Sequence, residues 1–363
     1  ASTSVTENSI TVTVNGSDTH SGIVQYRFSS DNGSSYTTVS STNNSYTYTF
    51  NGLNSGTTYN IAVQVVDAAG NTSSIITRNV ATEKSGDIMR EIIAGYNIGN
   101  RGSFSSAYTT ATTNTVFQTA DWKGTSYYFA GAPTDNWVRF GGYYWRIVRV
   151  NGDGSVRLIY NGTSTTTTGT GTLINNGSGQ AFNSSSNRSE YVGLKYTIGQ
   201  QHGQTTDSPI LNTLQSWYTS SNLDDYADYI DTSVGFCSDR NMASGSSWSS
   251  QPYSNIYYAT YERLDTNESP SLACTTNDII AEPVGLITAD EVSFAGGGNF
   301  ILNTHYYLYN NQYYWTTSPF GFSSGAGVFY VSLDGNLDYS GVNWTEYGVR
   351  PVINLKADTR FTG

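Results

Sequence analysis

The stretch YGVRPVINL, residues 347–355, indicates how the larger part of this chain is closed. Its apolar residues are those of a buried strand, but Arg350 stands among them and is followed by Pro351, which cannot donate a hydrogen bond to a neighbouring strand. An unpaired buried charge is costly, so we expect Arg350 to bind a carboxylate or several carbonyl oxygens. The stretch therefore predicts a structural arginine in a strand that closes a domain, with the function elsewhere.

Two helices are predicted before this strand. GLITADEVSFAGG, residues 285–297, begins with a capping box formed by Thr288 and Glu291 and ends at neighbouring glycines. SPILNTLQSWY, residues 208–218, begins with Ser208 as the N-cap and has a proline in its first turn. We expect a helix in each segment.

Strands are predicted on both sides of these helices. The segments YYWTTSPF (313–320) and GVFYVSLDGNLDYSG (327–341) predict a strand and a hairpin. Earlier in the chain, residues 136–160 predict three strands, with a hairpin turn at 151–154. Arginines that alternate with apolar residues in those strands predict one polar face of a sheet. They are Arg139, Arg146, Arg149 and Arg157.

The N-terminal part has a different organisation. Short segments alternate polar and apolar residues and are separated by turn signals, which predicts an all-β sandwich; they are residues 9–14, 24–29, 45–50 and 58–67. The stretch GLNSGTTYNIAVQVVDAAGNTS (52–73) resembles a fibronectin type III or bacterial immunoglobulin-like domain. The resemblance implies a core or corner position for Tyr59.

We therefore expect two domains and a β-rich α+β fold class. An immunoglobulin-like β-sandwich is expected over residues 1–83, and a larger domain over residues 84–363. The stretch EKSGD (83–87) has the composition of a linker, and the apolar residues of IMREIIAGYNI (88–98) have helical spacing.

Composition excludes several classes of function. Charged residues make up 12% of the chain and the formal net charge is -11, which argues against a nucleic-acid partner. The longest apolar runs are too short for a membrane span, and no signal peptide is visible. An abundance of Gly, Ser, Thr, Asn and Tyr is typical of extracellular β-rich proteins and of adaptable binding surfaces.

The chain has two cysteines, Cys237 and Cys274. We expect a disulfide between them, since the composition indicates an oxidising compartment. The closed loop would contribute about 4 kcal/mol in the chain-entropy model. A metal site is less favoured, because no histidine lies near the cysteines in the sequence, and no cofactor is expected.

The motifs of the larger part are together similar to the C-type lectin fold. A capped helix with the pattern L-x-T-x-x-E, a loop-rich sheet and a closing G-V-R strand are closest to the branch shared by formylglycine-generating enzymes and the variable proteins of diversity-generating retroelements. The segment 127–355 also resembles surface proteins of Gram-positive gut bacteria and their phages. The matching motifs lie at 127–159, 236–240, 285–292, 314–319 and 348–355. The resemblance implies an extracellular location, on a bacterial cell surface or a virion.

The resemblance also implies a binding surface near the C-terminus. In the retroelement variable proteins this region binds the ligand and is diversified by adenine-directed mutagenesis; the matching region here is 313–347. Aromatic residues among small polar ones are typical of a binding surface. We expect a protein or glycan ligand bound by Phe320, Phe322, Ser323, Ser324, Tyr330, Asp338, Tyr339, Asn343, Trp344, Thr345, Glu346 and Tyr347.

Calcium-dependent sugar binding fits the sequence poorly. The sugar site of true C-type lectins uses Glu-Pro-Asn or Gln-Pro-Asp together with Trp-Asn-Asp. The corresponding triplets here, at 282–284 and 251–253, end in Val284 and Tyr253 instead. Sugar stacking on exposed Trp or Tyr without calcium remains open.

Two further alternatives concern enzymes and structural components. An enzyme like the formylglycine-generating enzymes needs a cysteine pair late in the domain, whereas both cysteines here precede the helix at 285–297. The sequence also lacks a recognisable hydrolase motif, and we expect no enzymatic activity. A structural surface or phage-tail component, with the sandwich as a spacer, remains open.

Overall fold

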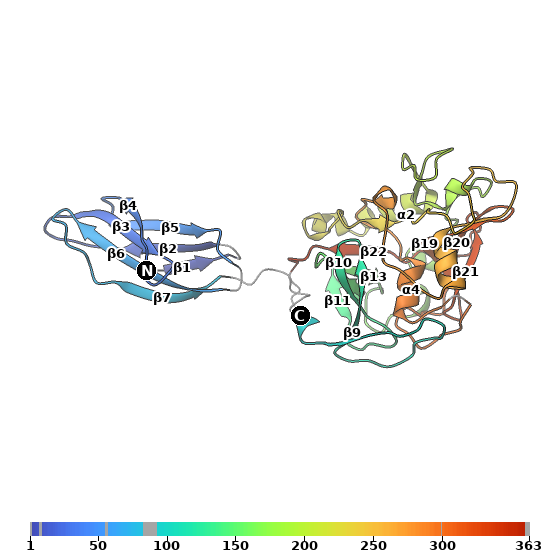
Figure 1. Cartoon of the computed structure of the whole chain (residues 1–363), viewed down its shortest axis with the longest axis horizontal. Helices are drawn as coiled ribbons and strands as arrows, with labels where there is room; N and C mark the ends of the chain where they lie inside the picture. Colours follow the sequence, from blue (N-terminus) through green and yellow to red (C-terminus); the bar gives the residue numbers. More distant parts are fainter. Residues whose placement is uncertain (1, 7–8, 55–56, 83–92, 299, 360–363) are drawn as a thin grey trace. The chain divides into compact units, whose positions relative to one another are not determined.

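The computed structural model of this protein describes residues 2–6, 9–54, 57–82, 93–298 and 300–359. The chain divides into two units, Ala1–Asp87 and Ile88–Gly363. The boundary expected after Glu83 and residues 88–92 of the helix expected over 88–98 lie outside the described residues. The last two residues of that expected helix, Asn97 and Ile98, lie instead in strand β8 (Asn97–Gly99), where they pair with β9 (Thr115–Asp121). The fold is β-rich α+β, as predicted, and strands dominate both units (Figure 1).

The first unit is a sandwich of two antiparallel sheets. One sheet has the order β1-β2-β5 and the other β4-β3-β6-β7. The strands are β1 (Ser2–Val5), β2 (Ser9–Asn15), β3 (Ile23–Ser29), β4 (Thr37–Ser40), β5 (Ser45–Asn51), β6 (Thr58–Asp67) and β7 (Ile76–Ala81). This is the strand order of an immunoglobulin-like sandwich of the fibronectin type III kind, and it confirms the strands predicted from the alternating segments.

Alternate side chains of these strands form the core between the sheets. Ile10, Val12 and Val14 of β2 are buried, while the residues between them are only partly buried. Tyr59 is the second residue of β6, and its hydroxyl accepts a hydrogen bond of 2.9 Å from the backbone N–H of Asn54, in the turn that leads into the strand. Tyr59 is therefore the corner tyrosine that the sequence suggested.

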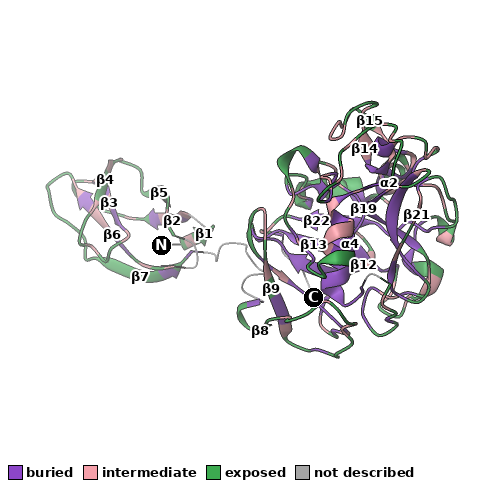
Figure 2. Ribbon diagram, turned by 45° about the vertical axis from the view of Figure 1, so that its right-hand side comes forward, coloured by how far each residue is buried: buried purple, intermediate pink, exposed green. Residues whose placement is uncertain are grey.

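The second unit contains a large mixed sheet. Its strands follow the order β22-β13-β12-β10-β9-β8, and β11 also pairs with β12. They are β8 (Asn97–Gly99), β9 (Thr115–Asp121), β10 (Gly124–Tyr128), β11 (Trp137–Phe140), β12 (Tyr143–Val150), β13 (Val156–Tyr160) and β22 (Val352–Leu355). Figure 2 shows that β13 and β22 are buried, whereas β8 at the edge is largely exposed.

A four-stranded antiparallel sheet carries the predicted binding region. Its order is β17-β19-β20-β21. The strands are β17 (Ile256–Tyr257), β19 (Tyr314–Phe322), β20 (Ala326–Val331) and β21 (Leu337–Gly341). They confirm the strand and hairpin predicted from residues 313–341. Two short pairs complete the strands: β14 (Lys195–Tyr196) with β15 (Thr206–Asp207), and β16 (Phe236–Cys237) with β18 (Ile279–Ile280).

Both predicted helices are present. Helix α2 (Pro209–Ser220) is capped by the side chain of Ser208, and α4 (Ala289–Ala295) begins with the capping box of Thr288 and Glu291. The remaining helical segments are α3 (Ala259–Tyr261), a π turn (Glu262–Thr266) and 3-10 turns at Gly169–Thr172, Asn175–Gly177, Ser189–Val192, Leu223–Tyr229 and Thr276–Asp278. No helix of the described ranges is long and apolar enough to cross a membrane.

Arg350 has the structural role that the sequence predicted. It is buried just before β22 and donates hydrogen bonds to the carbonyl oxygens of Tyr160 and Leu308, at 2.9 and 2.7 Å, and to the side-chain oxygen of Asn161 at 3.0 Å. Neutral oxygens thus solvate the guanidinium and tie the closing strand to the end of β13.

The four arginines of the large sheet do not form a single polar face. Arg139 is exposed, but Arg146, Arg149 and Arg157 are buried. Arg149 and Arg157 both bind Glu291 Oε1, at 2.9 and 2.6 Å, and Arg149 also binds Asp121. The sequence could not show this arrangement, because the carboxylates come from α4 and from β9, far away along the chain.

Candidate ligand-binding surface

The predicted ligand-binding residues lie in different environments. Some are exposed: Ser323, Ser324, Tyr339, Asn343, Trp344, Thr345 and Glu346. Phe322 and Asp338 are partly buried, and Phe320, Tyr330 and Tyr347 are buried. The structure therefore brings only part of the set to the surface.

Tyr330 and Tyr347 belong to a packed aromatic cluster. Their ring centroids are 4.4 Å apart, and the ring of Tyr347 lies 4.3 Å from that of the fully buried Trp315. The hydroxyl of Tyr330 donates to Asp338 at 3.1 Å. Burial, reinforced by the charge of Asp338, raises the pKa of Tyr330. These tyrosines hold the sheet to the domain, and we leave both out of the proposed surface.

A row of glycines crosses the sheet. Gly321 of β19, Gly327 of β20 and Gly341 of β21 are direct register partners, and Tyr257 of β17 pairs with Gly321 at the end of the row. Register partners in an antiparallel sheet direct their side chains to the same face. The row therefore leaves one face of the sheet without side chains along a line across three strands.

Aromatic rings lie against the backbone of this row. A Cβ atom on Gly321 would meet the ring of Tyr257 at 3.1 Å, and one on Gly341 would meet the indole of Trp344 at 3.0 Å. A Cβ atom on Gly327 would be 3.7 Å from the ring of Phe320. Gly321 and Gly341 thus allow two aromatic rings to approach the sheet closely on one face, and the ring of Phe320 lies near Gly327 on the same face.

Tyr339 extends this arrangement. It lies two residues before Gly341 on β21, so it is on the same face. Its ring stacks on the ring of Phe320, with the centroids 3.5 Å apart and the planes within 5°. Phe320 is buried, whereas 44% of Tyr339 is exposed.

Sequence reasoning missed two tyrosines at the other end of the same face. Tyr257 and Tyr261 stack with their centroids 4.6 Å apart, and the ring of Tyr261 lies 5.0 Å from Phe320. A hydrogen bond to Asp265, with burial, raises the pKa of Tyr261. The only signal was the aromatic run IYYATY at 256–261, outside the region suggested by the resemblance. We call Tyr257, Tyr261, Phe320, Tyr339 and Trp344 the aromatic strip.

A turn after β21 supplies the other end of the strip. The backbone N–H of Trp344 donates to the carbonyl of Gly341 at 3.1 Å. The side-chain oxygen of Asn343 would lie 3.2 Å from a Cβ atom on Gly341, beside the indole. Since 55% of Trp344 is exposed, its ring and the Asn343 amide are presented together to solvent.

The segment that forms this sheet has almost no positive charge. Between Arg240 and Arg350 the sequence contains a single lysine or arginine, Arg263. Arg263 binds both oxygens of Asp290, at 3.0 and 2.8 Å, and also donates to Asp239. Its charge is therefore neutralised, and the surface that this segment contributes is neutral to acidic.

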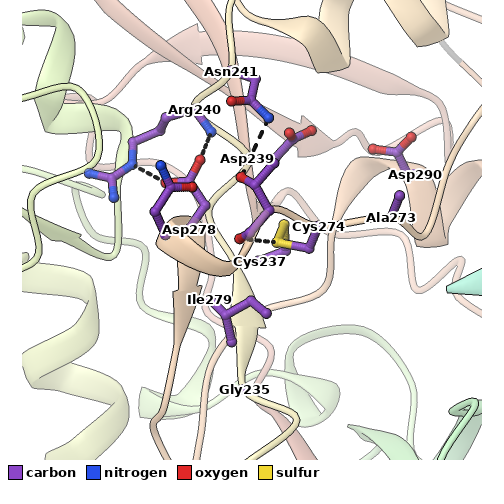
Figure 3. The surroundings of a disulfide bond; sticks show 12 residues. Gly235, Cys237, Asp239, Arg240, Asn241, Ala273, Cys274, Asp278, Ile279 and Asp290 are labelled. Carbon is purple, nitrogen blue, oxygen red and sulfur yellow. Dashed lines mark hydrogen bonds and ion pairs between the residues drawn. A yellow bond between two sulfur atoms is a disulfide. The ribbon is translucent and has the colours of Figure 1, made fainter. Parts of the chain in front are cut away.

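The ion pairs of Arg263 also hold in place the segment that carries the tyrosines of the strip. Arg263 lies in the π turn that follows Tyr261, whereas Asp290 lies on α4. Next to Asp239, the predicted disulfide Cys237–Cys274 is present, and Arg240 binds Asp278 at 3.0 Å (Figure 3). The ion pair between Arg263 and Asp290 ties the tyrosine end of the strip to α4, and the disulfide and the Arg240–Asp278 pair brace the segments beside Asp239.

Comparisons with known proteins add little to this description. The chain is similar to the solved FN1–FN3 domains of chicken CNTN1, with 25% identity over 23% of this chain and 30% of that chain, and a TM-score of 0.19. The chain thus spans less than a third of that relative's length. No family model and no curated protein match this chain. The architecture described above rests on strand order and register.

Proposed function

We propose that this protein is an extracellular ligand-binding protein of the adhesin or receptor-binding type. The observation that supports the proposal is the aromatic strip on the glycine row of β19–β21. Large exposed aromatic rings beside small polar side chains are the usual anchors of binding surfaces. Tyr339, Asn343 and Trp344 are the residues for which we expect the largest effects on binding.

A C-type lectin fold for the second unit belongs to the same proposal. Strand β22 near the C-terminus pairs with β13, one of the earlier strands of the unit. Two helices, α2 and α4, lie between β13 and the β19–β21 hairpins in the sequence. This order supports the resemblance to the fold, in which the loops and strand faces before the closing strand bind ligands.

We also propose that the exposed part of this region is the diversified part, as in retroelement variable proteins. The diversified residues would be Ser323, Ser324, Tyr339, Asn343 and Thr345. Trp344 and Glu346 are exposed as well, but adenine-directed mutagenesis of Asn codons would not yield them. Apart from Tyr339, which stacks on Phe320, residues at these exposed positions should tolerate replacement because few packing contacts depend on them. The buried Tyr330 and Tyr347 do not, since they pack against Trp315.

An extracellular location is supported by the disulfide. Cys237 and Cys274 are bonded, and such bonds persist in oxidising compartments. Within this proposal the location is a bacterial cell surface or a virion.

The proposal is tested by binding to a panel of immobilised extracellular proteins and glycans. The wild-type chain is compared with the triple variant Tyr339→Ala, Asn343→Ala, Trp344→Ala. The matched control is Tyr229→Ala, because Tyr229 is also exposed but lies beside Lys356, next to β22. We expect ligands that the control retains and the triple variant loses. Equal binding by all three proteins would contradict the assignment of the surface.

A further inference from the structure

We infer that the aromatic strip binds an uncharged oligosaccharide by stacking, without calcium. This inference rests on the proposed ligand-binding function and names the chemical class of the ligand. Three features of the strip support it: the orientation of its rings, its lack of positive charge and the hydrogen-bonding groups at its two ends.

Tyr339 is held so that it presents a flat ring face. Its ring lies parallel to that of Phe320, and 44% of the residue is exposed, so the face opposite to Phe320 can meet a ligand. Trp344 adds a second exposed ring, with Cδ1 and Nε1 of its indole nearest to Gly341. The apolar face of a sugar ring is a flat patch of C–H groups that such an aromatic face can cover.

The glycine row fixes the direction of the strip. It runs across β19, β20 and β21, with strands about 4.8 Å apart. Tyr257 and Tyr261 lie at one end and Trp344 at the other. An extended chain of several sugar units could therefore contact more than one ring at once, which a single sugar could not.

The charged residues around the strip favour an uncharged ligand over an anionic one. The segment that forms the sheet has no lysine or arginine apart from Arg263, which is held by Asp290 and Asp239. Glu346 is exposed two residues after Trp344, and Asp265 binds the hydroxyl of Tyr261. Sulfated or sialylated sugars would meet these carboxylates without a compensating lysine or arginine from this segment.

Hydrogen-bonding groups lie beside the rings. Asn343 presents its amide next to the indole of Trp344, and Tyr257 and Tyr261 carry hydroxyl groups at the opposite end. Amides and hydroxyls both donate and accept hydrogen bonds, which matches the alternating hydroxyl groups of a sugar. No group of three or more His, Cys, Asp or Glu side chains that could hold a metal ion occurs among the described residues. Stacking on aromatic rings needs no bridging cation, and the test is therefore made without calcium.

The test is a glycan array probed with the full chain in EDTA. The array carries neutral oligosaccharides of glucose, xylose, mannose, galactose and N-acetylglucosamine, with sulfated and sialylated counterparts. We expect binding to at least one neutral oligosaccharide. Trp344→Ala and Tyr339→Ala should each weaken it by at least about tenfold, and Trp344→Phe should weaken it less, because it keeps a ring face. Tyr229→Ala should bind like the wild type.

Several outcomes would overturn the inference. They are the absence of binding to any neutral oligosaccharide, a preference for the sulfated or sialylated forms, loss of binding in EDTA, or equal binding by Trp344→Ala and the wild type. Thermal unfolding of each variant distinguishes loss of the ring from loss of the fold. If a panel protein binds the wild type but not Trp344→Ala while no neutral sugar binds, the inference is wrong and the proposed function stands.

Discussion

The ring of Tyr339 lies flat on the ring of Phe320, with the centroids 3.5 Å apart. Phe320 comes from β19 and Tyr339 from β21, so the stack bridges over β20 between them. The glycine at position 327 leaves the space that the bridge needs, since a larger side chain there would point at the Phe320 ring. A buried aromatic side chain thus sets the orientation of an exposed one.

This stack should be measurable as a coupling between the two residues. A double-mutant cycle with Phe320→Leu and Tyr339→Ala should give a coupling free energy of about 0.5–1.5 kcal/mol, because aromatic pairs contribute this much beyond their buried area. The measurement is chemical denaturation of the four proteins, followed through the transition of the second unit. Additive effects of the two substitutions would show that the rings do not support each other.

Gly341 and Gly327 provide a matched pair of positions for alanine substitution. A methyl group at Gly341 would meet the Trp344 indole at 3.0 Å, whereas one at Gly327 would be at an ordinary distance of 3.7 Å from Phe320. We expect Gly341→Ala to displace the indole and therefore to change the tryptophan fluorescence emission spectrum. The spectral difference between the wild type and Trp344→Phe shows how large a change at Trp344 can be, and it is the scale for this comparison.

Gly327→Ala should leave the emission unchanged, and it serves as the control. Since Trp344 is exposed, the indole can move, and the free energy of unfolding should change little in either variant. If both variants gave the same emission spectrum as the wild type, the contact between the indole and Gly341 would be disproved.

The carboxylate of Glu291 should dominate the stability of the second unit. Glu291→Gln leaves Arg149 and Arg157 buried without their shared carboxylate, so we expect a loss of about 3–5 kcal/mol in the free energy of unfolding. Urea denaturation measures it. The control is Asp225→Asn, an exposed position on a 3-10 turn, which should change the free energy by less than about 0.5 kcal/mol.

The same carboxylate predicts a pH dependence. Burial alone would raise the pKa of Glu291, but Arg157 and Arg149 outweigh burial and hold it below the ordinary value. A depressed pKa in the folded state means that the contribution is complete above the unfolded pKa of about 4.3 and is lost as the pH falls toward the folded pKa. The difference in stability between wild type and Glu291→Gln should therefore shrink below about pH 4.3. A constant difference down to pH 2 would contradict this account.

The codons that vary in the population should be those of exposed residues. Deep resequencing of the codons for residues 313–347 in a population of the source should find replacements at exposed positions such as Ser324, Asn343 and Thr345, confined to adenines. The codons for Tyr330 and Tyr347 should be fixed, because these residues pack against Trp315. An invariant region would remove the retroelement part of the proposal and leave a conventional adhesin or tail component.

Local features of the fold could be predicted because their causes are local. The capping box of Thr288 and Glu291 marks the beginning of α4, and alternation marks β2 and β6. The aromatic strip could not be predicted in the same way. It depends on the register that aligns Gly321, Gly327 and Gly341, and irregularities in β19 near Pro319 set that register.

Contacts between residues that are far apart in the sequence could not be predicted either. Nothing near Arg149 in the sequence indicates that its partner is Glu291, so its burial was not foreseen. The aromatic composition of residues 313–347 likewise could not separate rings that face solvent from rings that face the core. Tyr330 and Asp338 are register partners on the face opposite to Phe329 and Tyr339, and only the pairing of β20 with β21 shows this.

The central claim is that the exposed end of the aromatic strip binds the ligand. The most direct test is a calorimetric titration of the strongest ligand from the panel with the wild type, the triple variant Tyr339→Ala, Asn343→Ala, Trp344→Ala, and Tyr229→Ala. We predict a dissociation constant at least about 100-fold higher for the triple variant and unchanged for Tyr229→Ala, because two aromatic anchors are removed. The same dissociation constant for all three proteins would contradict the claim and place the binding site elsewhere on the molecule.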